Sequence, residues 1–140
     1  MPSFDIGLQH RVKRLAQQTA DQHRHLAALR REIDAAFERG ALHDARSALN
    51  RFEVALAAHF DLEQGFFFPA LHGLSPSRSA DLEALEREHA GFLAELRMLG
   101  AGIERVSADA SREAVAQSLA ALRDHEKREE RLVALISDRA

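Results

Sequence analysis

Apolar residues recur at steps of three and four along almost the whole chain, and no stretch alternates polar and apolar residues at a period of two. Steps of three and four keep side chains on one face of an α-helix, whereas alternation is typical of a strand. Glycine and proline are scarce, at 7 and 3 residues, while the strong helix formers alanine and leucine are common. The pattern predicts an all-α protein.

Three interruptions, at "ERGALHD", "PALHGLSPSRS" and "GAGIERVSADAS", divide the chain into four helical segments. We expect these helices at approximately residues 8–38, 43–70, 79–102 and 109–137. Gly40, Gly73 and Gly100 are the expected stops, because glycine adopts the left-handed conformation that ends many helices. Ser79 and Asp109 are the expected N-caps. Short connections join antiparallel neighbours, so we predict a single domain over residues 1–140, folded as an up-down-up-down four-helix bundle.

Each predicted helix carries a histidine on the face that should be buried, and the second and fourth helices add a glutamate four residues later. These residues are His23, His59, Glu63, His89, His125 and Glu129. The interval from His23 to His89 is the same as that from His59 to His125 and from Glu63 to Glu129. Apolar pairs such as Leu26 with Phe92 follow the same offset. We interpret this pattern as one helical hairpin used twice, which predicts a pseudo-twofold bundle.

Six buried polar residues require partners, because burying an unpaired charge costs several kcal/mol and a domain is stable by only about 5–15 kcal/mol. One interpretation is a core network in which histidine and glutamate satisfy one another. The favoured interpretation is a metal site, because dications would neutralise the carboxylates and take the lone pairs of neutral imidazoles.

The HxxxE spacing on two helices favours two metal ions. Two carboxylates on facing helices can each bridge metals about 3.5–4 Å apart, and the four histidines then divide two per metal. Ligation by nitrogen and oxygen without sulfur suits iron or manganese, and zinc is also compatible with these ligand types.

The order H…HxxxE…H…HxxxE, with one element per helix, resembles the hemerythrin-like family, also called the HHE cation-binding domain. The resemblance covers roughly residues 10–137 and includes "QHRHLAAL", "HFDLEQGFFFPAL", "REHAGFLAEL" and "DHEKREERL". It implies a non-haem di-iron centre, with an oxo or hydroxo bridge, inside an antiparallel four-helix bundle. Carried over by position, it implies terminal ligands at His23, His59, His89 and His125, and bridging carboxylates at Glu63 and Glu129.

The chain departs from the oxygen-carrying hemerythrins on the third helix, where those proteins have HxxxH. The positions four before and four after His89 are Leu85 and Leu93, so one ligand is missing unless water, Glu86 or another side chain replaces it. The resulting ligand pattern more closely resembles that of hemerythrin-like proteins that sense iron or oxygen, handle nitric oxide or repair iron centres. It implies a protein that binds or reacts with O₂, NO or peroxide, in sensing, redox chemistry or iron handling.

Two other function classes stay open from the sequence. The chain could be a helical interaction module that bound metal regulates or stabilises, or a protein for iron storage or buffering. Enzyme status also stays open, because no general acid–base pair stands apart from the candidate ligands.

Several other residues are expected to lie outside the site. His25 is the alternative to His23; His10, His43 and His72 are expected at the surface. Glu126 and Glu130 are expected behind the ligands or in solvent, and Glu88 is not expected to face its neighbour His89. Phe66 is expected to pack below the metals, leaving Phe67 or Phe68 for a homodimer contact or for cover by "MPSFDIG".

Composition excludes several classes. The net charge of -3 gives no reason to expect a nucleic acid or an anionic membrane partner. The absence of cysteine removes disulfides, zinc–thiolate sites and iron–sulfur clusters. The chain shows neither a signal peptide nor an apolar run of about 18 residues, so we expect a cytoplasmic protein. The absence of tyrosine and tryptophan argues against radical transfer.

Overall fold

The computed structural model describes residues 6–138, which are almost entirely helical and contain no strand. The prediction of an all-α protein is therefore confirmed. The elements are α1 (Ile6–Glu38), α2 (Leu42–Leu62), a π-helix (Glu63–Phe67), α3 (Phe68–Leu74), a 3₁₀ turn (Pro76–Arg78), α4 (Ser79–Gly102) and α5 (Ala108–Asp138).

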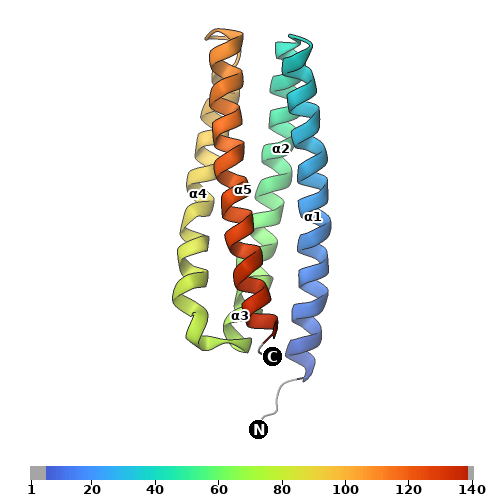
Figure 1. Cartoon of the computed structure of the whole chain (residues 1–140), viewed down its shortest axis with the longest axis vertical. Coiled ribbons are helices and arrows are strands. Elements are labelled where there is room, and N and C mark those ends of the chain that lie inside the picture. Colours follow the sequence, from blue (N-terminus) through green and yellow to red (C-terminus); the bar gives the residue numbers. More distant parts are fainter. Residues whose placement is uncertain (1–5, 139–140) are drawn as a thin grey trace.

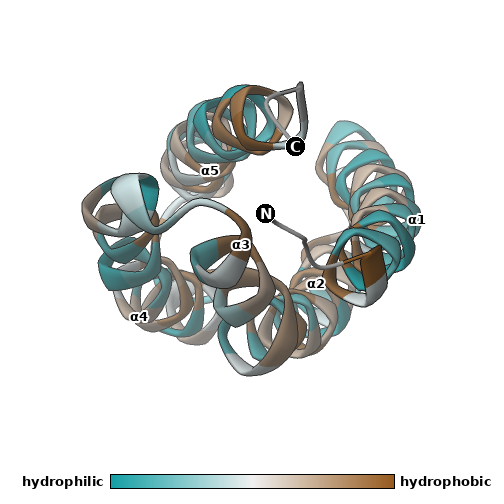
Figure 2. Cartoon of the chain, turned by 90° about the horizontal axis from the view of Figure 1, so that it is seen from below, coloured by the Kyte–Doolittle hydropathy of each residue, from teal (hydrophilic) through white to brown (hydrophobic). Residues whose placement is uncertain are grey.

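Four long helices lie along a common axis in Figure 1, where the chain rises along α1, returns along α2, rises along α4 and returns along α5. The short α3 continues α2 at the end of the bundle where α1 begins and α5 ends. Seen from that end, α1, α2, α4 and α5 surround a common interior (Figure 2). None of the helices among the described residues is long and apolar enough to cross a bilayer.

Two apolar clusters fill the interior, one toward each end. On α1, Val12 and Leu15 belong to one cluster, whereas Leu26, Leu29 and Ile33 belong to the other. On α5 the change of cluster falls between residues 122 and 132. The polar residues of the predicted inner faces lie in the layer between the two clusters. The fold therefore encloses that polar layer between two apolar clusters.

Glycine has different roles at the three expected helix stops. Gly40 has φ +69 and ends α1, as predicted. Gly73 and Gly100 are helical, so that prediction was wrong for both. A Cβ on Gly73 would meet Leu8 at 3.2 Å, and one on Gly100 would meet Asn50 at 3.5 Å. Close approach of Leu8 accounts for the small side chain at Gly73, whereas the distance at Gly100 is an ordinary van der Waals contact that would admit a Cβ.

The two expected N-caps were also wrong. The Ser79 side chain makes no capping hydrogen bond and instead pairs with His72 Nδ1 at 2.7 Å. At the start of α5, Ser107 Oγ accepts a hydrogen bond from the Ala110 N–H at 3.1 Å, so Ser107 acts in place of Asp109.

The π-helix corrects the expectation for the three phenylalanines. Phe66 is 64% exposed, whereas Phe67 and Phe68 are each 1% exposed and pack in the cluster nearest the chain ends. A π-turn contains more residues than an α-turn, so Phe67 takes the inward direction that α-helical spacing assigns to Phe66. Phe67 and Phe68 therefore belong to the apolar cluster that borders the polar layer.

Candidate metal centre

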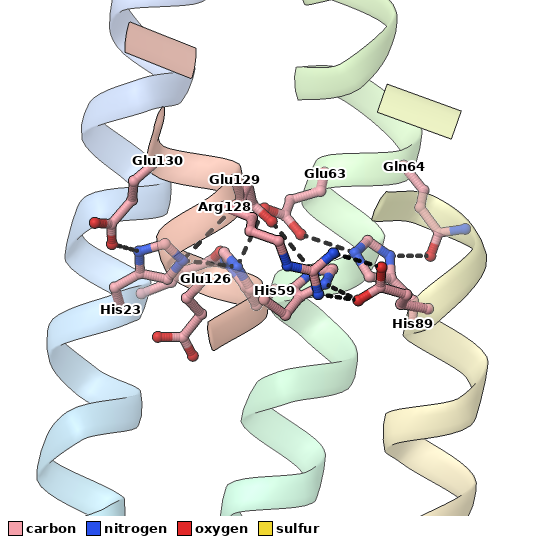
Figure 3. A network of polar contacts seen from close by, with 12 residues as sticks. His23, His59, Glu63, Gln64, His89, Glu126, Arg128, Glu129 and Glu130 are labelled. Carbon is pink, nitrogen blue, oxygen red and sulfur yellow. Dashed lines mark hydrogen bonds and ion pairs between the residues drawn. The ribbon is translucent and has the colours of Figure 1, made fainter. Parts of the chain in front are cut away.

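All four long helices, together with the π-helix, contribute to one polar layer (Figure 3). Its members are His23 from α1, His59 from α2, Glu63 from the first position of the π-helix, His89 from α4, and His125 and Glu129 from α5. His23 has a side chain 17% exposed, and the other five residues are at most 2% exposed. The structure thus brings together all six residues singled out by the sequence.

Each carboxylate reaches histidines on both sides of the layer. Glu63 Oε2 lies 3.3 Å from His59 Nε2, and Glu63 Oε1 lies 3.3 Å from His89 Nε2. Glu129 Oε1 lies 3.9 Å from His23 Nε2, and Glu129 Oε2 lies 3.5 Å from His125 Nε2. The His23 and His59 Nε2 atoms are 3.1 Å apart. Two groups follow, one around His23 and His59 and one around His89 and His125, with the carboxylates between them.

The ligand atoms are close enough to hold metal. In the first group, one donor atom from each of His23, His59, Glu63 and Glu129 lies within 4.8 Å of all the others. The same limit holds for His89, His125 and Glu129. A nitrogen-and-oxygen donor set of this kind suits iron, manganese or zinc.

Unpaired buried atoms concentrate in the same layer. Both Glu63 oxygens, Glu129 Oε2, His89 Nε2 and His125 Nε2 are buried without a hydrogen-bond partner among the described residues. Each such atom costs about 1–3 kcal/mol unless something satisfies it. Because all five can present lone pairs to one small volume, the residues fit a cation rather than a self-satisfied polar network.

Glutamine residues support one histidine of each group from behind. His59 Nδ1 lies 2.6 Å from Gln22 Oε1, and His89 Nδ1 lies 3.1 Å from Gln64 Oε1. An oxygen at this position accepts the Nδ1–H hydrogen bond and thereby leaves the Nε2 lone pair facing the centre.

Carboxylates support the other two histidines. His125 Nδ1 lies 3.0 Å from Glu88 Oε1, and His23 Nδ1 lies 3.5 Å from Glu130 Oε1. Arg128 holds Glu88 through two contacts of 2.8 and 2.5 Å. The expectation for Glu88 was too narrow: it does not face His89, its neighbour in sequence, but it does orient His125 on the next helix.

Sequence reasoning missed Gln22, Gln64 and the role of Glu88, although a signal for them exists. The interval that separates the two histidines of each repeat pair also separates Gln22 from Glu88 and Gln64 from Glu130. The offset of the histidines therefore extends to the residues behind them.

Burial sets the protonation of the metal-free centre. It raises the pKa of Glu63 to about 7 and raises the pKa of Glu129 well above its ordinary value. Burial, followed by the nearby His125 and His59, lowers the pKa of His89 to about 3. Burial also lowers the pKa of His59. The imidazoles of His59 and His89 are therefore ready to donate lone pairs, whereas the carboxyls must lose protons when a metal binds.

Two groups have pKa values that shift in the opposite direction: His125, a histidine of the layer, and Glu88, the carboxylate behind it. For His125, burial lowers the pKa, but the nearby carboxylates of Glu129 and Glu88 outweigh it and raise the pKa overall. Hydrogen bonding from Arg128 lowers the pKa of Glu88 to about 2, so this carboxylate stays charged behind its histidine.

The remaining candidates lie outside the ligand groups. His25 is exposed and lines a groove between α1 and α2, which removes it as an alternative to His23. Leu85 and Leu93 pack with the two apolar clusters, and Glu86 belongs to neither ligand group. Glu126 is 8% exposed and pairs with Arg30, so it does not lie in solvent.

Comparison with known proteins agrees with this geometry. The family described as the hemerythrin HHE cation-binding domain matches residues 14–135. Searches of curated proteins and of solved structures found no match. Because the family match covers most of the chain, including all six residues of the layer, the chain belongs to the hemerythrin HHE cation-binding domain family.

Proposed function

We propose that the protein is a non-haem di-iron protein that binds or reacts with O₂, NO or peroxide, in sensing, redox chemistry or iron handling. The observation that carries the proposal is the placement of each carboxylate between two histidine groups. Glu63 lies 3.3 Å from both His59 and His89, which suits a ligand shared by two metals. His23 and His59 would hold one metal, and His89 and His125 the other.

We infer that the bundle is antiparallel and pseudo-twofold, as the sequence offset predicts. The support is the matched pairing behind the ligands: Gln22 serves His59 as Glu88 serves His125. Gln64 likewise serves His89 as Glu130 serves His23. Each metal would therefore have one histidine backed by an amide and one backed by a carboxylate.

A bound pair of redox-active metals would supply electrons to a small molecule in an open coordination position. The chain's own residues hold the ligand rings and exclude water. Phe60 stacks on His89 with ring centres 3.8 Å apart, and Phe92 packs edge-on to His125 at 5.2 Å. Aromatic walls of this kind fix the imidazoles and keep the centre dry.

An interaction module regulated or stabilised by metal is the second candidate function. It is favoured by large apolar side chains at the surface, where Val54, Phe66 and Met98 are 71%, 64% and 67% exposed. We also propose a homodimer contact through Phe66, because its large apolar side chain is exposed. Iron storage has less support, because deep burial of five ligands opposes easy metal exchange.

The test is metal content per chain together with the visible spectrum, before and after anaerobic reduction and re-exposure to air. Two irons per chain with the absorption of an oxo-bridged pair would support the proposal. A colourless protein that takes up no metal from ferrous iron would overturn it and favour the interaction module. Bound metal that reacts with neither diatomics nor peroxide would also favour the module.

A further inference from the structure

A polar cleft of ≈ 620 Å³ lies between α1 and α5, beside the metal layer. Small-molecule pockets are typically about 300–1,000 Å³, so the cleft has the size of a ligand site. His23 forms one end of it, and three alanines in its walls leave the room: Ala27, Ala116 and Ala120.

An ion pair forms the inner part of this cleft. Arg30 of α1 pairs with Glu126 of α5, and both side chains are only 11% exposed. The Arg30 guanidinium also lies over the Phe52 ring, 5.4 Å from its centre. Figure 3 shows the Glu126 carboxylate turned away from the histidine cluster. Arg30 is thereby held in place, yet its Nε–H is buried without a hydrogen-bond partner within residues 6–138.

Two further arginines line the cleft from opposite helices. Arg31 comes from α1 and Arg123 from α5, and neither makes a hydrogen bond or an ion pair with any described residue. The acidic lining residues are Asp34 and Glu126, and Glu126 already forms an ion pair with Arg30. Three guanidinium groups against two carboxylates leave the cleft with a positive charge and two guanidiniums without partners.

We propose that this α1/α5 cleft binds a small oxyanion, a molecule that presents a phosphate or carboxylate group to Arg31 and Arg123. Guanidinium groups suit such oxygens because their planar N–H donors match the geometry of carboxylate and phosphate. An anion between the two helices also removes the repulsion of two cations that share one cleft. The proposal does not depend on the di-iron assignment, because none of its three arginines belongs to the metal layer.

The test is isothermal titration of the protein, as purified, with inorganic phosphate and, separately, with succinate at constant ionic strength. We expect saturable binding of at least one probe, weakened at least roughly tenfold by Arg31→Gln and by Arg123→Gln. Arg105→Gln is the matched control, since it removes the same charge from an exposed position outside the cleft. Binding of phosphate alone would assign a phosphorylated ligand, and binding of succinate alone a carboxylate.

Two outcomes would overturn the proposal. One is the absence of saturable binding by either probe. The other is binding that Arg31→Gln and Arg123→Gln leave unchanged, or that Arg105→Gln weakens equally, since the anion would then sit on the metals or respond only to net charge. Metal content measured on each variant keeps this result separate from the di-iron proposal, because the arginine variants should retain full metal.

Discussion

The six residues of the metal layer act as a unit because each carboxylate contacts histidines from different helices. We predict that His59→Ala and Glu63→Ala each lose metal and stability, since metal affinity is coupled to folding in a site built from four helices. Metal analysis and thermal unfolding measure both effects.

The repeat mates provide the comparison for that experiment. His125→Ala and Glu129→Ala should behave like His59→Ala and Glu63→Ala. His43→Ala, at an exposed position, should change neither metal content nor stability. Stoichiometric metal retained in His59→Ala would contradict the ligand assignment.

The residues behind the histidines should affect affinity without being ligands. Removing the Gln64 oxygen with Gln64→Leu should weaken metal binding by roughly 10–100-fold, because His89 loses the acceptor that fixes its ring and tautomer. Competition with a chelator measures the change. Gln18→Leu, at an exposed position on α1, is the control and should bind metal normally.

Metal affinity should depend on pH in a direction set by Glu63. Its carboxyl has a pKa of about 7 in the metal-free protein and must ionise to bind metal. Apparent affinity should therefore fall about tenfold per pH unit and per proton displaced as pH decreases below 7. His89 adds no such dependence near neutrality, since its pKa is about 3. Chelator competition across this range checks the slope, and a flat profile would contradict it.

At the scale of elements, the π-helix decides which phenylalanine is structural. Phe67→Ala should reduce the free energy of unfolding by about 3–5 kcal/mol, because it empties a buried position. Phe66→Ala should change it by less than about 0.5 kcal/mol, because that side chain is exposed. Urea unfolding compares the two variants. The reverse order of stability would mean that the segment is α-helical in solution.

At the scale of the whole molecule, metal should stabilise the bundle across its polar layer. Free metal at about 1,000 times its Kd contributes about 4 kcal/mol by mass action, so chelation should lower Tm. Restoring metal should restore Tm in the parent protein. Glu63→Ala should show neither response, which separates a specific effect from general action of the chelator on the fold.

The sequence by itself determined the helical class and the six residues of the layer. Both depend on short-range periodicity: apolar steps of three and four define a helix face, and positions 59 and 63 necessarily share one. The constant internal offset then matched His23 with His89 and Glu63 with Glu129.

Only the tertiary structure decided what lies around those residues. Glu88 supports His125 rather than His89, because a partner on another helix depends on the relative rotation and height of the two helices. The inward direction of Phe67 depends on the π-turn, which the apolar run "GFFF" does not distinguish from an α-turn. The cleft between α1 and α5 likewise joins Arg31 and Arg123, which lie far apart in the chain and share no pattern. Local periodicity therefore specifies which face of each helix is buried, whereas packing between helices selects the partners that meet there.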